Sequence, residues 1–282
     1  MAESGVLTSS DFRRISDMLR TRVGISLSDK KRGLLTARLG SMMRARGYTS
    51  YGELADRLER DPEGPLFIEL VNRLSTNHTY FDREPMHFTF LAQDLVPRWE
   101  AELTQGRRER VRIWSAAASS GEEPYNLAMT ISDHSDAVRA ASKILGTDIA
   151  GSALEKADKG IYGEKELARL AQSRRAAHFE RTSQGERISQ HIRDMVVFRR
   201  LNLVRDTYPF RHMFDLIFCR NVLIYFDEDL QQSIVNAMMR HLTMGGHLVV
   251  GHSETLDRGS FGLQYRRPGV YQRTGDSKGA TS

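Results

Sequence analysis

The segment from Val111 to Asp148 constrains the fold of this chain more than any other. An apolar run at 111–114 ends in the small residues A-A-A-S-S-G and leads into a helical pattern with Leu127 and Ile131 on one face. A second apolar run, I-L-G-T-D, ends at Asp148. A strand, a tight turn and a helix in this order bring backbone N–H groups close to a nucleotide-sized ligand at the strand's end.

The acidic residue at the end of the second run indicates which kind of ligand to expect. A carboxylate accepts two hydrogen bonds at once, so Asp148 suits the two hydroxyls of a ribose. The segment therefore predicts an adenosine-containing cofactor. It lacks G-x-G-x-x-G, so the dinucleotide fingerprint is absent and a nicotinamide dehydrogenase is disfavoured.

The composition is that of a soluble globular protein. The 282 residues are 40% hydrophobic and 27% charged, which allows one large or two modest domains. Cys219 is the only cysteine, so no internal disulfide is possible, and the nine histidines form no cluster with metal-ligand spacing. We expect a cytoplasmic protein without a metal, a membrane span or a signal peptide.

The chain reads as a small helical domain followed by a larger α/β domain. The pattern predicts a flexible tail at 1–9, four short helices at 10–75, a linker and helix completing the site at 76–110, an α/β domain at 111–274 and a disordered tail at 275–282. Ser9 or Ser10 is the expected cap of the first helix, which Gly24 ends, and Ser50 is the expected start of the third.

The α/β domain alternates strand and helix patterns, which favours a doubly wound sheet. The expected strands are 144–148, 194–203, 214–219 and 247–251, in addition to the one at Val111, with a final hairpin at 263–273. The expected helices are 150–158, 165–177 and 229–242. A small β insertion is expected at 179–195, with its turn at Gln184-Gly185.

Five motifs, in order along the chain, resemble those of the CheR-type chemotaxis receptor methyltransferases. They are N-H-T-Y-F-D-R-E, W-S-A-A-A-S-S-G-E-E-P-Y, G-T-D-I, F-C-R-N-V-L-I-Y-F and G-H-S-E, within about residues 10 to 272. The resemblance implies a Rossmann-like class I methyltransferase sheet with a small all-α N-terminal domain and a small antiparallel β insertion. It also implies transfer of a methyl group from S-adenosylmethionine to glutamate side chains of membrane chemoreceptors, giving methyl esters and S-adenosylhomocysteine.

This chemistry needs orienting groups more than acids and bases. A glutamate carboxylate is already ionised at neutral pH, so no strong general base is required. The enzyme must align the carboxylate oxygen with the methyl carbon and sulfur and remove water from the nucleophile. No Ser/His/Asp or Cys/His arrangement stands out in the sequence, which agrees with this requirement.

The resemblance also implies roles for individual residues. Arg83 orients an incoming carboxylate through its planar fork, Tyr225 lies near the transferred methyl, Asp148 holds the ribose, and the Asn202 amide reads the adenine edge. One of Glu122 and Glu123 contacts the cofactor, and the sequence leaves open which; Ser253 and Glu254 are expected to be structural. The implied catalytic residues are Arg83 and Tyr225, and the implied cofactor pocket is Asn77, Thr79, Arg83, Glu122, Glu123, Asp148, Asn202, Leu203, Arg220 and Asn221.

A basic stretch near the N-terminus is a candidate surface for the receptor. Residues 11–46 hold ten Lys or Arg and three Asp, a balance of seven positive charges, whereas receptor methylation helices are rich in glutamate. We expect Arg38 and Arg46, on the outward face of the 30–46 helix, to bind the substrate. A monomer that is recruited to receptor arrays is the expected form.

Two departures from the family pattern bear on partner choice. The insertion around Gln184-Gly185 is short, which favours an enzyme that does not bind a receptor C-terminal tail peptide. Asp82 stands where an aromatic residue is common, and His78 where an acidic one often occurs. Substrate preference can therefore differ from that of other family members.

Two other functions stay open from the residues alone. A methyltransferase acting on nucleic acid suits the basic charge balance, but no N-P-P-Y or D-P-P-Y stretch is present, so no nucleic-acid partner is expected. A non-catalytic cofactor-sensing module is disfavoured because all the motifs are complete.

Overall fold

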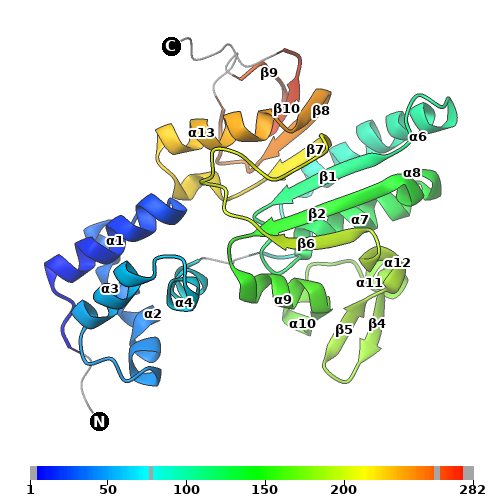
Figure 1. The fold of residues 1–282 in the computed structure, drawn as a ribbon. Coiled ribbons are helices and arrows are strands. Elements are labelled where there is room, and N and C mark those ends of the chain that lie inside the picture. The colour runs from blue at the N-terminus through cyan, green and yellow to red at the C-terminus, as the bar shows by residue number, and fades with distance from the viewer. Residues whose placement is uncertain (1–4, 76–78, 257–260, 276–282) are drawn as a thin grey trace.

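The computed structural model describes residues 5–75, 79–256 and 261–275 and places them in a helical domain and a larger α/β domain (Figure 1). Asn77, His78 and residues 276–282 lie outside the described residues. Gly5 donates its backbone N–H to the carbonyl of Thr49, so the N-terminal segment is tied to the helical domain from this residue onward.

The helical domain contains the four helices expected between residues 10 and 75, confirmed with small shifts in their bounds. They are α1 (Ser9–Val23), α2 (Arg32–Ala45), α3 (Tyr51–Arg60) and α4 (Pro65–Leu74), with a short 3-10 helix (Asp29–Lys31) before α2. Gly24 ends α1 and Ser50 caps α3, as expected. The cap of α1 was predicted wrongly: Thr8, not Ser9 or Ser10, accepts the N–H of Asp11, because Ser9 is already helical.

The α/β domain is built on a seven-stranded sheet with the order β6-β2-β1-β7-β8-β10-β9. The first five of these strands run parallel, while β10 and β9 are antiparallel, which confirms the doubly wound α/β class and the final hairpin. The strands are β1 (Val111–Ala116), β2 (Ser142–Asp148), β6 (Val196–Arg200), β7 (Phe214–Cys219), β8 (Leu242–Val250), β9 (Leu263–Arg267) and β10 (Val270–Arg273).

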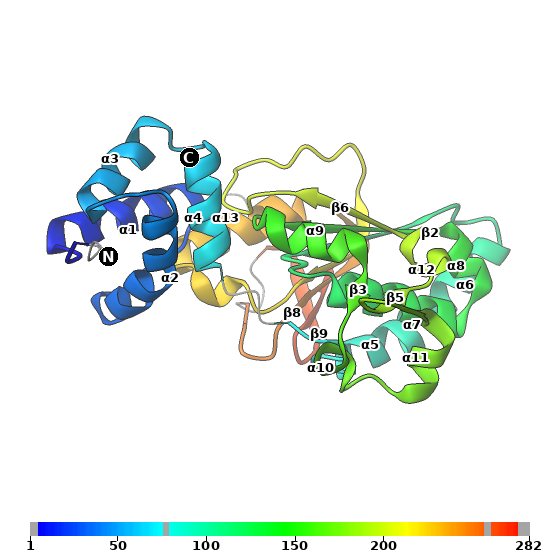
Figure 2. The same ribbon diagram turned by 90° about the horizontal axis from the view of Figure 1, so that it is seen from below.

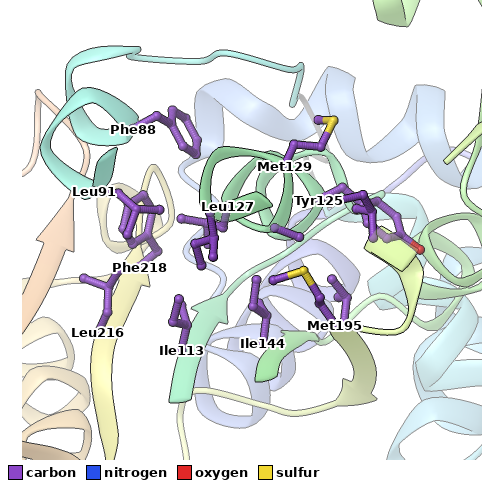
Figure 3. Packing of buried hydrophobic residues seen from close by; sticks show 14 of the residues in the cluster. Phe88, Leu91, Ile113, Tyr125, Leu127, Met129, Ile144, Met195, Leu216 and Phe218 are labelled. Carbon is purple, nitrogen blue, oxygen red and sulfur yellow. The ribbon is translucent and has the colours of Figure 1, made fainter. Parts of the chain in front are cut away.

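Side-chain alternation along the strands sorts the core into two layers. Ile113 and Leu216 pack on one face with Phe218 and Leu127 of α7, as Figure 3 shows, while Trp114 and Ile217 pack on the other face beside α13. The first face is covered by α5 (Met86–Phe90), a π-helical turn (Leu91–Leu95), α6 (Val96–Thr104), α7 (Glu122–His134), α8 (Asp136–Ala141) and α12 (Gln190–Arg193), and the second by α13 (Glu228–Met239).

Contacts between the two domains form at the edge where the parallel strands end (Figure 2). Helix α4 packs against α9 (Gly151–Lys159), and the Asn202 side chain donates to the carbonyl of Arg22 at 2.7 Å. Gly24 has φ 70°, and a Cβ there would lie 2.6 Å from the Phe226 ring, so only glycine allows α1 to end this close to the other domain.

The small antiparallel insertion is present, and its hairpin turn lies where the sequence indicated. Its strands are β3 (Ile161–Tyr162), β4 (Phe179–Thr182) and β5 (Gly185–Ile188), in the order β3-β5-β4. The single helix expected at 165–177 is wrong. It is two helices, α10 (Glu164–Leu167) and α11 (Gln172–His178), because the chain turns between them to bury Leu170 in the core.

The boundary between α13 and β8 also differs from the prediction. The helix expected to reach residue 242 ends at Met239, and the strand expected from His247 begins at Leu242. Leu242 pairs with Phe214, and the irregular register beside it lets β8 pass through Gly245, which has φ 75°. Gly245 therefore lies within an irregular part of the strand.

Among the described residues, no helix combines the length and apolar character needed to cross a bilayer.

Candidate functional site

A pocket lies at the carboxyl ends of β1, β2 and β7, where doubly wound sheets bind their ligands. The helical domain closes one side of this pocket through Val23, Ile25 and Leu74. The pocket brings together nine residues named from the sequence: Thr79, Arg83, Glu123, Asp148, Asn202, Leu203, Arg220, Asn221 and Tyr225.

The turn after β1 forms one wall and is backbone-strained. Ala117 and Ser119 have φ values of 65° and 50°, in the left-handed region that non-glycine residues rarely adopt. The Asp148 carboxylate holds this turn, accepting the N–H of Ser119 at 2.8 Å, and it also accepts the N–H of Ala150 at 2.8 Å. Burial raises the pKa of Asp148. Asp148 therefore braces the turn and faces the pocket at the same time.

One buried polar atom in this wall fits a polar ligand. The Ser119 hydroxyl is buried and has no hydrogen-bond partner among the described residues, although it lines the pocket. Buried hydroxyls normally have a partner, so a ligand that brings hydrogen-bonding groups to this wall would satisfy it. The neighbouring Ile149, Leu201 and Leu203 supply an apolar surface. Together, polar groups and an apolar wall match an adenosine with its ribose.

Glu122 and Glu123 are separated by the structure. Glu123 lines the pocket, accepting the Ser115 hydroxyl at 2.7 Å and pairing with Arg220 at 2.9 Å. Glu122 is turned away, where it accepts the Ser120 hydroxyl at 2.8 Å. Burial raises the pKa of both carboxyls. Of the two, Glu123 is the one placed to contact a ligand, and Glu122 is not among the pocket residues.

Arg220 is the buried centre of the site. Its side chain is 1% exposed and lies between Glu123, at 2.9 Å, and Glu84, at 3.1 Å. It also donates to the backbone carbonyl of Arg83. Burial opposes ionisation of Glu84, but the charge of Arg220, with hydrogen bonds from Asn221 and Arg220, outweighs it and lowers the pKa of Glu84. Arg220 thus links the loop that carries Arg83 to the start of α7.

Glu254 is structural, as the sequence indicated. Its carboxylate accepts the backbone N–H groups of Gly251 at 2.6 Å, Asn221 at 2.7 Å and Leu223 at 2.8 Å. These bonds hold the chain after β7 in the turn that includes Asn221, whose φ is 57°. The Asn221 amide then donates to Glu84 at 3.2 Å. Glu254 is not among the described lining residues and supports the pocket through the backbone that carries Asn221.

Glu84, His87 and His252 have possible metal-ligand atoms within 4.8 Å of one another. The Glu84 carboxylate already accepts from Arg220 and Asn221, however, and a metal cation there would stand beside the Arg220 guanidinium. We therefore interpret this cluster as structural support for the loop that carries Arg83.

His87 gives the site a pH dependence that can be measured. Burial, followed by the charge of Arg220, lowers the pKa of His87 to about 4, so the unfolded chain takes up its proton first as pH falls below about 6.5. Stability is therefore lost as pH falls through this window. Compared with a His87→Asn variant, the wild type should lose about 2 kcal/mol more between pH 7.5 and pH 5.0 in urea unfolding. A difference that stays constant with pH would contradict a neutral buried His87.

Arg38 does not point into solvent from the outward face of its helix, as was predicted. Its guanidinium is half-buried and donates to the carbonyls of Arg73 at 3.2 Å, Leu74 at 2.7 Å and Ser75 at 3.3 Å, closing the end of α4. Arg46 is exposed but pairs with Glu69 at 2.7 Å. Long basic side chains next to helix C-termini bind the last carbonyls readily. Arg38 is therefore a cap of α4, and the predicted outward orientation is wrong.

The Asn202 amide is also partly committed. Its oxygen accepts the N–H of Val204 at 3.1 Å, and its nitrogen donates across the domain boundary to Arg22. That the Asn202 amide reads the edge of adenine stays a prediction. The sequence reading missed the wall from the helical domain. It also missed the lining residues Tyr80, Phe88, Ala117, Ser119, Ile149, Leu201, Val222 and Phe226. In the sequence, Val23 looks like any core residue of the first helix, so nothing marked it as part of a pocket.

The fold is that of a class I methyltransferase, and comparison with known proteins identifies the cofactor class and the family. Residues 77–265 match the CheR methyltransferase SAM-binding domain, and residues 10–75 match the CheR methyltransferase all-alpha domain. This chain belongs to the CheR methyltransferase family.

Several named relatives match nearly the whole chain. A chemotaxis protein methyltransferase of Borreliella burgdorferi is 36% identical over 270 residues, covering 95% of each chain. One from Escherichia coli is 38% identical over 258 residues, covering 90% of this chain and 87% of the relative. Among solved structures, the N-methyltransferase NodS from Bradyrhizobium japonicum, in complex with S-adenosyl-l-homocysteine, overlaps 57% of this chain and 63% of its own, with a TM-score of 0.30 and 14% identity.

Proposed function

We propose that this protein transfers the methyl group of S-adenosylmethionine to glutamate side chains of membrane chemoreceptors, giving glutamate methyl esters and S-adenosylhomocysteine. The relatives named chemotaxis protein methyltransferases support this substrate. The proposal includes a monomer that works in the cytoplasm, is recruited to receptor arrays, needs no metal and does not act on nucleic acid.

The lining of the pocket is the observation that carries the proposal. None of the described lining residues is a His, Lys or Cys, and both carboxylates, Glu123 and Asp148, already accept hydrogen bonds from the protein. An amine acceptor must lose a proton before it attacks, whereas a glutamate carboxylate is ionised at neutral pH. A pocket without an available base therefore suits a carboxylate acceptor.

The bound cofactor supplies a methyl group on a positively charged sulfur, which is already an activated leaving group. The protein's part is orientation and exclusion of water. Asp148 and the Ser119 wall hold the ribose side, and Glu123 meets the amino group of the methionine portion. Arg83 lines the pocket and presents its planar fork to the incoming carboxylate, while Tyr225, 37% exposed, helps to orient it.

Binding and transfer test this proposal together. S-adenosylhomocysteine should bind the purified protein by calorimetry, and an Asp148→Ala variant should bind it at least about tenfold more weakly, because a bidentate acceptor is lost. Tritiated methyl groups should pass from the cofactor to receptor-containing membranes in a form that mild alkali releases. Label that resists alkali would point to methylation of nitrogen and would contradict the proposal.

The basic helical domain is proposed to meet the acidic receptor. With Arg38 committed to α4 and Arg46 to Glu69, the exposed Lys30 and Lys31 are the residues to test. A Lys30→Glu/Lys31→Glu variant should methylate receptors about tenfold more slowly at low salt, and the difference should shrink at high salt. Affinity for S-adenosylhomocysteine should stay within twofold of the wild type.

The matched control changes the same charge at the opposite end of the sheet. Arg107 and Arg110 are exposed and precede β1, far along the strands from the pocket. An Arg107→Glu/Arg110→Glu variant should leave receptor methylation nearly unchanged. Equal slowing by both double variants would show that only the net charge of the protein matters. Lys30 and Lys31 would then not belong to the surface that meets the receptor.

The short insertion supports an enzyme that does not depend on a receptor tail. β4 and β5 are joined by a two-residue turn at 183–184, so the hairpin extends little beyond the sheet. Titration with a receptor C-terminal tail peptide should give no heat of binding, and a measurable affinity would overturn this part of the proposal.

A further inference from the structure

The loop that carries Arg83 is held in a strained conformation. Asp82 has φ 58° and Glu84 has φ 55°, on either side of Arg83, and neither is a glycine. Such residues persist in the left-handed region only when the surrounding structure fixes them. Whatever fixes Asp82 and Glu84 therefore also fixes where Arg83 points.

The two residues are fixed from opposite directions. Glu84 is bound by Arg220 and Asn221, which belong to the site described above. The Asp82 carboxylate accepts the Asn126 amide at 3.0 Å and a guanidinium nitrogen of Arg174 at 3.2 Å. Arg174 comes from α11, in the segment that leads into the small β insertion, and does not line the pocket.

Arg174 is itself immobilised along α7. Its guanidinium donates to the Asn126 side chain at 2.9 Å and to the Thr130 hydroxyl at 2.8 Å, and its Nε donates to Asp133 at 3.0 Å. Its side chain is 17% exposed. A guanidinium held by this many acceptors presents a fixed fork, which a lysine in its place would not reproduce.

We propose that Arg174 is a positioning residue for methyl transfer. By holding Asp82 against α7, it sets the left-handed turn that aims Arg83 into the pocket, and it links the β insertion to the site. The contact between Arg174 and Asp82 is ionic, so it ties the loop to α7 through paired charges. The rate effect assigned to Arg174 rests on the proposed function, whereas its effect on the loop does not.

Arg175 provides a matched control. It is the neighbouring arginine on the same helix, and it pairs with Glu164 and Glu186 of the insertion, away from the loop. Arg174→Met should lower kcat about 10- to 100-fold, as a misplaced orienting group does, while the affinity for S-adenosylhomocysteine stays within threefold. Arg175→Met should leave kcat within twofold of the wild type.

A double-mutant cycle tests whether Arg174 acts through Asp82. Asp82→Ala alone should also lower kcat, and adding Arg174→Met should make it little worse, because both changes remove the same contact. Effects that multiply in the double variant would overturn the proposal. A fall in kcat with Arg175→Met as large as with Arg174→Met would overturn it as well.

Amide hydrogen exchange separates this inference from the proposed function, since it needs no substrate. Residues 79–85 should exchange faster in Arg174→Met than in the wild type, and Arg175→Met should match the wild type there. If the wild type does not methylate receptors, the proposed function fails, yet faster exchange in this loop would still support the role of Arg174. Unchanged exchange in Arg174→Met would overturn it.

Discussion

Replacing Arg220 with methionine should lower receptor methylation by about 10²- to 10³-fold, the effect of losing a fixed charged group that organises a site. Arg220 is the buried cation between Glu84 and Glu123, so its loss removes the positive charge that both carboxylates share. Leaving buried charges unpaired costs about 3–5 kcal/mol, so the variant should also unfold at lower urea concentration. Single-turnover assays and urea unfolding would measure both effects.

An Arg220→Lys variant distinguishes charge from geometry. A lysine keeps the positive charge but cannot bind Glu84, Glu123 and the Arg83 carbonyl together, because it lacks the planar fork. We expect stability to recover in part while methylation stays well below the wild type. If Arg220→Met methylated receptors at the wild-type rate, Arg220 would not hold the site together.

Replacing Arg83 with methionine should lower kcat by about 10²- to 10³-fold. Arg83 lies in the pocket between two anchored acids, and its fork is the group proposed to align the incoming carboxylate. Binding of S-adenosylhomocysteine should fall much less than kcat, because the ribose side is held by other residues. Calorimetry and single-turnover methylation of receptor membranes would separate the two effects.

Arg169 is the matched control for Arg83. Both guanidinium groups lie over the Tyr80 ring, at 4.0 Å for Arg169 and 5.8 Å for Arg83, but Arg169 does not line the pocket. Arg169→Met should keep kcat within about threefold of the wild type, as expected for an exposed cation on an aromatic ring. Equal losses in the two variants would mean that any positive charge beside Tyr80 suffices.

Much of the fold follows from local patterns. The apolar runs that hold Ile113 with Trp114 and Leu216 with Ile217 predicted buried strands, and each pair points to opposite faces of the sheet. Gly24 and Ser50 marked helix ends where the structure has them. These signals are short in range, which is why a single sequence carries them.

The failures at the candidate site concern contacts between distant segments. Helical spacing placed Arg38 outside, but α4 ends beside it, and its open carbonyls bind the guanidinium. Spacing alone treats Glu122 and Glu123 alike, whereas the packing of Arg220 selects Glu123. The partner of Asp82 is Arg174, 92 residues further along the chain, and no periodicity connects them.

The most direct test of the proposed function is to find the atom that receives the methyl group. Receptor cytoplasmic domains treated with the protein and S-adenosylmethionine would be digested at mildly acidic pH and sequenced by tandem mass spectrometry. We expect the added methyl on glutamate side chains, absent when S-adenosylmethionine is omitted and strongly reduced with the Arg83→Met variant. Methylation confined to lysine, histidine or copurified nucleic acid, with unmodified glutamates, would contradict the proposed function.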